Sequence, residues 1–286
     1  MKILITGSEG FVGRAFARYF HGAGHDITRV DIKRGIDARA FFAKDDTKFD
    51  LVIHLAAVVG GRATIEGNPL AVACDLAIDS DLFQWALRTK PGRIVYYSSS
   101  AAYPISLQEY PFEVQLMESD IDLNDISNPD LTYGWAKLTG EMLAKYARQQ
   151  GLKVTILRPF SGYGADQDLD YPFPSFIARG KAKANPFKVW GSGRQVRDFI
   201  HIDDVVAGTM KAVEADIEVA NLCTGRATSF LELARMVMDE AGYSAPIDAD
   251  ETAPVGVFYR VGDPKLMLSF YQPKISLEEG IARSLK

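Results

Sequence analysis

Residues 2–13 read KILITGSEGFVG, and this stretch decides the fold. A β-branched run ends at Thr6 and is followed by Gly7, Gly10 and Gly13, with a helical pattern directly after them. At such a turn the glycines allow a tight bend, a close approach of backbone to a pyrophosphate, and close packing of helix on strand. Free N–H groups at the helix N-terminus would face the phosphates. The stretch therefore predicts a dinucleotide-binding turn rather than a glycine-rich turn without a ligand.

An acidic residue, Asp31, ends the second predicted strand, roughly two dozen residues beyond the first glycine. A carboxylate there can accept hydrogen bonds from both hydroxyls of an adenine ribose and would repel a 2′-phosphate. It therefore predicts NAD rather than NADP. Lys33 and Arg34 follow closely and leave an NADP or dual preference open. Asp37 could reach the adenine amino group or be an exposed loop carboxylate.

Further short β-branched runs alternate with amphipathic segments along the chain. The runs cover residues 26–31, 51–57, 93–99 and 153–159. This alternation predicts an α/β fold with a doubly wound parallel sheet covered by helices on both faces. Proline and glycine cluster after residue 159, so we expect a dinucleotide-binding domain over 1–158 and a smaller, interleaved substrate-binding region over 159–286. A helix and a strand at 201–224 are expected to return to the first domain, and 229–242 predicts a helix outside the sheet.

Composition sets limits on partners and compartment. The chain has 286 residues, of which 47% are hydrophobic, and a net charge of −5. This balance gives no electrostatic footprint for nucleic acid or an anionic membrane. No apolar run approaches the roughly 20 residues needed to cross a bilayer, and we expect a cytoplasmic protein. Cys74 and Cys223 lack metal-site spacing, so we expect no metal, and both are expected to be buried small apolar residues.

A candidate for proton chemistry lies in the segment LTYGWAKLTGEMLAKYA, residues 131–147. Tyr133 and Lys137 are four residues apart, which places them on one face of a helix. A lysine ammonium beside a phenol lowers the pKa of the phenol toward working pH. The spacing alone is common on helices, but its place after a dinucleotide turn favours function. Upstream, a strand ends in Ser98, Ser99 and Ser100 at the edge of the sheet where ligands of open α/β folds bind.

Taken together, these segments resemble the extended short-chain dehydrogenase/reductase family, in its NAD-dependent nucleotide-sugar epimerase and dehydratase branch. The matching motifs are TGSEGFVG at the glycine turn, HLAA at 54–57, YGWAK at 133–137, LRPFSGYG at 157–164, VWGSGRQVRDFIHIDDVV at 189–206 and PKISLEEGI at 273–281. They follow the order of the family's own motifs over nearly the whole chain. The resemblance implies a Rossmann domain, an NAD cofactor, a nucleotide-sugar substrate and a homodimer formed by the Tyr133 helix and the helix near 75–87.

The family's roles transfer to matching positions. Tyr133 would be the acid/base for a sugar hydroxyl, Lys137 would bind the nicotinamide ribose, and Ser99 would assist, with Ser100 as the fallback. The resemblance implies these cofactor-binding residues: Gly7, Gly10, Phe11, Val12, Gly13, Asp31, Asp37, Leu55, Ala56, Ala57, Ser98, Tyr133, Lys137 and Pro159. It implies these substrate-binding residues: Ser99, Ser100, Tyr133, Ser161, Arg197 and Arg260, the two arginines holding the diphosphate. For Arg260 a surface salt bridge is the alternative.

Departures from the family pattern constrain the reaction. The 4,6-dehydratases carry Asp and Glu where this chain has Ser100 and Ala101, and the 3,5-epimerase group uses a cysteine at the position of Ala101. Asp75 and Ser161 each replace a common Asn. What remains is epimerisation at C4 through a keto intermediate, or a 4-ketoreductase that uses the same residues. Rival hypotheses are a non-catalytic nucleotide sensor and an enzyme for a carbonyl compound that carries no nucleotide.

Overall fold

A six-stranded parallel sheet forms the centre of the larger region of the protein. The computed structural model describes residues 1–58, 67–253 and 255–286. The strands are β1 (Lys2–Thr6), β2 (Asp26–Val30), β3 (Leu51–His54), β4 (Ile94–Tyr97), β6 (Val154–Pro159) and β11 (Val219–Leu222). Their spatial order is β11-β6-β4-β3-β1-β2, and every neighbouring pair is parallel. The predicted doubly wound parallel sheet is therefore confirmed.

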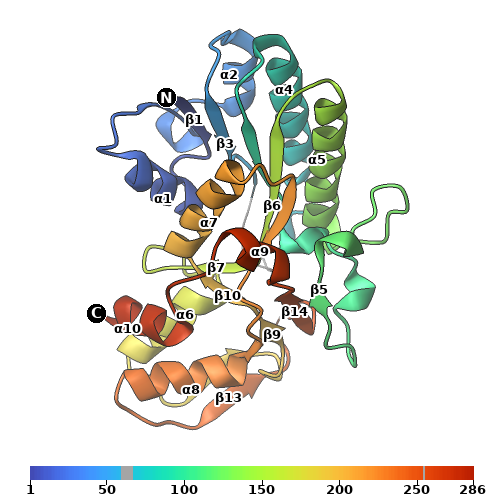
Figure 1. The fold of residues 1–286 in the computed structure, drawn as a ribbon. Helices are drawn as coiled ribbons and strands as arrows, with labels where there is room; N and C mark the ends of the chain where they lie inside the picture. Colours follow the sequence, from blue (N-terminus) through green and yellow to red (C-terminus); the bar gives the residue numbers. More distant parts are fainter. Residues whose placement is uncertain (59–66, 254) are drawn as a thin grey trace.

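Helices cover both faces of this sheet (Figure 1). The covering helices are α1 (Phe11–Phe20) and α7 (Ile202–Glu214) on one face, and α2 (Ala38–Lys44), α4 (Ala73–Thr89) and α5 (Leu131–Gln149) on the other. Side chains of a strand point alternately to the two faces, and β1 shows this directly. Ile3 and Ile5 pack in a core with Phe16 of α1, whereas Leu4 packs in a second core with Trp85 of α4.

The remaining elements form a smaller region beneath the carboxyl ends of the strands (Figure 1). Three helices, α6 (Pro172–Lys181), α8 (Phe230–Glu240) and α10 (Leu277–Leu285), share one apolar core. Short strands complete it: β7 (Ser161–Tyr163) with β10 (Phe199–His201), β8 (Phe187–Trp190) with β13 (Ile247–Asp250), and the set β12 (Thr228–Ser229), β9 (Val196–Arg197), β14 (Tyr259–Gly262) and β5 (Gln115–Leu116). Helix α9 (Lys265–Phe270) lies between the two regions. The division at residue 158 stays a prediction.

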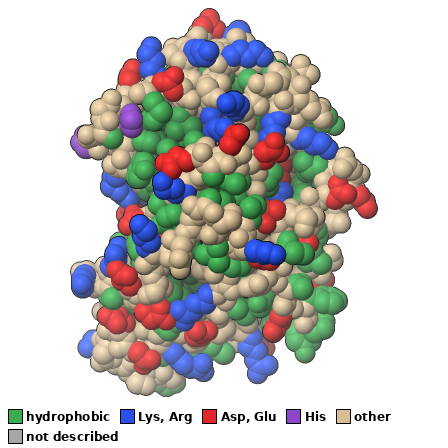
Figure 2. Space-filling view, in the orientation of Figure 1, with side chains coloured by type: hydrophobic (Ala, Val, Ile, Leu, Met, Phe, Trp, Pro, Cys, Tyr) green, Lys and Arg blue, Asp and Glu red, His purple; other side chains and the backbone are tan. Residues whose placement is uncertain are grey.

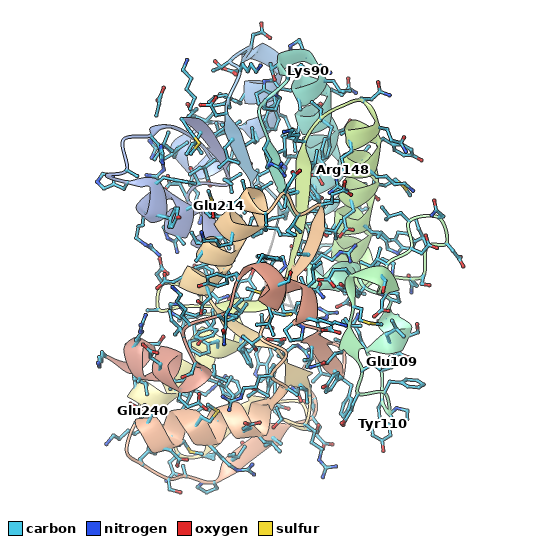
Figure 3. All side chains as sticks on the ribbon, viewed as in Figure 1. Lys90, Glu109, Tyr110, Arg148, Glu214 and Glu240 are labelled. Carbon is cyan, nitrogen blue, oxygen red and sulfur yellow. The ribbon has the colours of Figure 1, made fainter. Side chains whose placement is uncertain are left out.

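The chain nevertheless returns to the first sheet after entering the smaller region. Helix α7 packs against α1, and β11 pairs with β6 from Val219–Ile156 to Leu222–Pro159. Arg148, labelled in Figure 3, donates from Nε to the Val154 carbonyl at 2.8 Å and ties the end of α5 to the sheet. The segment from α7 to β11 therefore belongs to the sheet of the first region, although it follows elements of the smaller region in the sequence.

The two cysteines differ in their burial. Cys223 is buried directly after β11, but Cys74 is exposed, so the expectation that both cysteines are buried is wrong for Cys74. The cause is helical periodicity, because the neighbouring Asp75 takes the inward-facing position of α4.

In the described ranges no helix is long and apolar enough to cross a membrane. Acidic and basic side chains are interspersed on the face drawn in Figure 2.

A buried ion pair joins α5 to β6. Arg158 donates from Nε and Nη2 to the two carboxylate oxygens of Glu141, at 2.9 and 2.7 Å, and both side chains are almost completely buried. Ser98 also donates to Glu141, at 2.5 Å, and Arg158 donates to the hydroxyl of Tyr103 and the carbonyl of Glu118. This bidentate, fully hydrogen-bonded geometry is the kind that offsets the cost of burying two charges.

We therefore expect Arg158→Met to lower the free energy of unfolding by about 3–5 kcal/mol, because it leaves the Glu141 carboxylate buried without its cation. The double variant Arg158→Met/Glu141→Leu should recover much of this loss, since no unpaired charge remains. Chemical denaturation measures both values. Lys211→Met, which removes an exposed pair with Glu214, is the control and should cost less than about 1 kcal/mol. Equal losses in the single and double Arg158 variants would contradict the argument.

Candidate active site

The glycine turn after β1 has no room for side chains. Gly7 has φ of 67°, and a Cβ placed on it would lie 2.7 Å from the backbone carbon of Leu55. A Cβ on Gly13 would lie 2.2 Å from the carbonyl oxygen of Gly7. Gly10 is the N-cap of α1 and donates to the same carbonyl at 3.1 Å. The turn is thus a bare backbone cradle at a helix N-terminus, which fits a bound pyrophosphate.

The segment after β3 lies against this turn. Thr6 accepts hydrogen bonds from the backbone N–H groups of Leu55 and Ala56, each at 3.2 Å, through its hydroxyl oxygen. Ala57 follows in the same half-buried loop. On the helix side, Phe11 and Val12 pack against the core of the sheet. The predicted cofactor residues of the first and third strands are therefore brought together.

Asp31 is fixed at the rim of the turn. Its carboxylate accepts from the N–H of Glu9 at 2.8 Å and from the N–H of Lys33 at 2.8 Å. The Glu9 carboxylate in turn pairs with Arg29 at 2.8 Å and Arg34 at 3.1 Å. The positive charge of Arg34, which would otherwise favour a 2′-phosphate, is thus partly neutralised by Glu9.

Asp37, for which contact with adenine and an exposed loop position were both open, begins helix α2. It is exposed, and its side chain accepts from the Arg39 N–H at 2.8 Å as the N-cap of α2. Capping of this kind stabilises a helix by about 1 kcal/mol, and this alone can explain why an aspartate occupies position 37. Contact of Asp37 with adenine stays a prediction.

The two side chains expected to perform proton chemistry lie together on α5. The Lys137 ammonium is 5.7 Å from the centre of the Tyr133 ring, and Lys137 is only 3% exposed. Burial raises the pKa of Tyr133, while Lys137 and a hydrogen bond with Ser99 oppose that rise. Among the protein's own groups desolvation outweighs the lysine, so the net pKa of Tyr133 is raised. The downward shift expected from the lysine and the positive nicotinamide ring together stays a prediction. The direction of the lysine's effect is as predicted.

Ser99, rather than Ser98, is the serine beside Tyr133. Ser98 turns its hydroxyl to Glu141, whereas Ser99 caps the short 3₁₀ helix at Ser100–Ala102 and hydrogen bonds with Tyr133. Helix α5 approaches this 3₁₀ helix so closely that a Cβ on Gly134 would lie 2.4 Å from the Ala101 carbonyl oxygen. This contact places the start of α5 next to the serines.

A buried chain of polar groups runs from the lysine to the glycine turn. Lys137 lies 5.5 Å from the centre of the Tyr96 ring, and the Tyr96 hydroxyl donates to Asp79 at 2.6 Å. The other oxygen of Asp79 lies 3.1 Å from His54 Nε2, and His54 Nδ1 lies 2.9 Å from the Thr6 hydroxyl. The hydrogen-bonded chain Tyr96–Asp79–His54–Thr6 thus reaches the strand before the glycine turn, and a cation–π contact joins its other end to Lys137.

A cavity of about 570 Å³ opens between the first sheet and the smaller region. Its wall includes Ser98, Ser99, Ser100, Ala101, Tyr133, Pro159, Ser161, Arg197 and Arg260. All the predicted substrate-binding residues therefore face one space. Sequence reasoning missed Tyr171, Arg179 and Trp190, which also line it. The many prolines and glycines near these residues in the sequence predicted a substrate-binding region, but they did not single out any one side chain.

The two predicted phosphate-binding arginines are fixed by neutral and charged partners. Arg197 donates from Nη1 to the carbonyls of Val196 and Val257, at 2.7 and 2.9 Å. Arg260 pairs with Asp130 at 2.7 Å and donates to Gln108 at 2.5 Å. Arg260 is 13% exposed at its side chain, so its ion pair lies inside the protein and is not the surface salt bridge of the alternative.

Asp75, which replaces a common Asn of the family, carries an unusual carboxylate. One oxygen accepts from the Val58 N–H at 2.6 Å, while the other has no hydrogen-bond partner among the described residues. Burial raises the pKa of Asp75 from 3.8 to about 6, against the opposing effects of Lys137 and the Val58 N–H. The folded protein therefore binds this proton more tightly than the unfolded chain does.

From this shift we expect a pH-dependent gain in stability for Asp75→Asn. The charged carboxylate destabilises the fold progressively as pH rises from about 4 to about 6, and the whole cost persists at higher pH. Since one pKa unit corresponds to about 1.4 kcal/mol, the variant should gain up to about 3 kcal/mol at pH 8 and almost nothing at pH 4. Denaturant titration at both pH values measures this. Asp81→Asn, on the same helix at a half-exposed position paired with Arg39, is the control and should show no gain that grows with pH. An equal gain for Asp75→Asn at both pH values would refute the assignment.

Comparison with known proteins identifies the family. A family model described as the NAD dependent epimerase/dehydratase family matches residues 3–223. The chain belongs to this family. The resemblance drawn from the motifs is thereby confirmed, together with NAD as the cofactor and an enzymatic role.

Individual relatives cover almost the whole chain. A dTDP-4-dehydro-6-deoxy-D-allose reductase from Streptomyces sp is 27% identical over 291 residues, which cover 91% of this chain and 87% of the relative. A putative UDP-glucose 4-epimerase from Methanocaldococcus jannaschii is 27% identical over 303 residues, covering 98% and 96%. The crystal structure of UDP-glucose 4-epimerase from Thermotoga maritima with UDP-glucose has a TM-score of 0.83 at 24% identity, covering 100% of this chain and 97% of that one, and supports the fold.

Proposed function

We propose that this protein epimerises a nucleotide-activated sugar at C4 by reversible oxidation through a keto intermediate. The observation that carries the proposal is the meeting of Ser99 and Tyr133 at the wall of the cavity, with the buried ammonium of Lys137 beside the Tyr133 ring. The chemistry that NAD supplies when bound is acceptance and return of a hydride at the sugar carbon. The cofactor would be held by the glycine turn, Asp31 and the loop at Leu55–Ala57. The turn suits a pyrophosphate because its glycines carry no Cβ, so the phosphates can approach the backbone closely.

The protein's own side chains move the proton. Tyr133, as phenolate, takes the proton of the sugar C4 hydroxyl, and returns it to the same oxygen after the keto sugar has turned over in the cavity. Ser99 hydrogen bonds to the reacting oxygen beside the tyrosine. Lys137 stabilises the phenolate, because its charge lowers the pKa of Tyr133 against the effect of burial. No proton or electron is gained or lost over the complete cycle.

Two neighbouring positions argue against other reactions of the family. Ser100 and Ala101 both face the cavity, so a catalytic group at either position would reach the sugar. Neither carries a carboxyl to protonate a leaving hydroxyl or to remove a carbon-bound proton, and Ala101 has no thiol. Chemistry restricted to one carbinol carbon needs none of these groups.

A 4-ketoreductase is the second candidate. The similarity to dTDP-4-dehydro-6-deoxy-D-allose reductase supports it, and Tyr133 would then donate its proton to the new alkoxide. The side chains and their roles are the same as in the epimerase. The difference is net consumption of reduced cofactor.

Loss of the phenol gives a direct test of the proton step. We expect Tyr133→Phe to lower kcat by about 10²–10⁴-fold, the usual worth of a positioned acid/base, with NAD binding preserved. Tyr146→Phe, an exposed position on the same helix, is the matched control and should retain activity. Turnover of nucleotide sugars and NAD affinity are the readouts. Unchanged kcat in Tyr133→Phe would show that another group moves the proton.

A second copy of this chain is the partner we infer for helices α4 and α5. The two helices pack side by side, and large apolar side chains remain exposed on each: Leu76 and Leu87 on α4, Trp135 and Tyr146 on α5. The members of each pair are eleven residues apart, which is about three helical turns, so each pair forms one stripe. A twofold axis would bury both stripes against their copies.

We expect sedimentation at micromolar concentration to give a dimer, and Leu76→Glu/Leu87→Glu to give a folded monomer, because two charges would enter the apolar contact. Leu268→Glu is the matched control, since Leu268 is 52% exposed on α9 outside this surface. A wild-type monomer at this concentration would contradict the proposed interface.

A further inference from the structure

One wall of the cavity follows helix α6 away from Tyr133. Tyr171 is the N-cap of α6 and lies close to Tyr133. Burial raises the pKa of Tyr171, and the nearby Tyr133 raises it further. Phe173, Phe176 and Arg179 then line the cavity from three successive turns of the helix. Since an α-helix rises 1.5 Å per residue, Arg179 lies about 12 Å along the axis from Tyr171. Arg179 therefore marks the end of the cavity remote from the reacting groups.

Four side chains along this wall form a continuous row. The guanidinium carbon of Arg197 lies 5.6 Å from the centre of the Phe230 ring. That ring lies 5.6 Å from the ring of Phe176, and the guanidinium carbon of Arg179 lies 5.5 Å from the centre of the Phe176 ring. All four line the cavity. The wall thus consists of a cation, two aromatic rings and a second cation.

The second cation differs from the other arginines of the site. Arg260 faces the carboxylate of Asp130, and Arg197 donates to backbone carbonyls. The Arg179 guanidinium makes no hydrogen bond or ion pair to any residue in the described ranges, and burial lowers the pKa of Arg179. A half-buried guanidinium with five donors and no acceptor is costly unless a ligand supplies acceptors.

The row fits a nucleoside diphosphate laid along it. Phosphates would lie at Arg197, the ribose and the flat base against the two rings, and the edge of the base at Arg179. A guanidinium donates two parallel hydrogen bonds to a pair of adjacent acceptors. Guanine presents such a pair, O6 and N7, on one edge, whereas adenine places a donor amino group beside N7 and thymine offers the single O4.

We propose that Arg179 reads the base of the nucleotide, and that this protein acts on guanosine diphosphate sugars. This assignment rests on the proposed function for the sugar end and extends it to the base end. Arg179 is then the specificity-determining residue, since the rings of Phe176 and Phe230 accept any base whereas the guanidinium fork selects adjacent acceptors.

Direct binding of free nucleotides tests the assignment without any turnover. Calorimetry on the full chain should give GDP a tighter affinity than UDP, dTDP, CDP or ADP. Removing N7 as an acceptor, with 7-deaza-GDP, should weaken binding about 5- to 150-fold, the worth of a bidentate base contact. Arg179→Gln should weaken GDP binding by a similar factor. In that variant GDP and 7-deaza-GDP should bind alike, because the two changes remove one interaction.

Control variants separate base reading from charge and folding. Arg179→Lys keeps the charge and loses the fork, so it should behave like Arg179→Gln, whereas Lys181→Ala, exposed on the same helix, should bind GDP as wild type. All variants should bind NAD equally. Tighter binding of another nucleotide, or equal loss for every nucleotide in Arg179→Gln, overturns the assignment. Arg179-dependent GDP binding with no epimerised GDP-sugar would instead count against the C4 reaction and leave the base assignment standing.

Discussion

The site depends on how closely helix α5 approaches strand β4 and the 3₁₀ helix that follows it. Two glycines on the inner face of α5 permit this approach: a Cβ on Gly134 would collide with the Ala101 carbonyl, and one on Gly140 would lie 1.7 Å from the Tyr96 hydroxyl oxygen. Glu141 then anchors the helix through Arg158 and Ser98. Without this approach Tyr133 would not meet Ser99.

The same approach sets the electrostatics of the reacting pair. It places the buried Lys137 beside the half-buried Tyr133 and within electrostatic reach of Asp79. Burial alone would lower the pKa of Lys137, but Tyr133, Asp79 and Asp75 outweigh it and the net shift is upward. The ammonium therefore stays charged where its charge is needed, beside a phenol whose pKa burial would otherwise raise further.

Much of this arrangement could be predicted from local sequence pattern. The glycine turn and the Tyr133–Lys137 pair follow from spacing along one strand–helix unit and one helix, because backbone geometry fixes such neighbours. The exposure of Cys74, the different partners of Ser98 and Ser99, and the sign of the Tyr133 pKa shift could not be predicted. Each depends on which distant element packs against the residue. The position of Arg179 could not be predicted either, since only the fold brings it to the cavity wall in one row with Phe230 and Arg197.

The restriction of chemistry to the sugar C4 is most directly tested by running the reaction on nucleotide sugars in D₂O and following the products by NMR. If the hydride removed from C4 is the one returned, the product should be inverted at C4, carry no deuterium on any sugar carbon, and form without net change in NADH. Deuterium at C3 or C5 would show that the protein moves protons at carbon, and would contradict the roles given to Ser99, Tyr133 and Lys137.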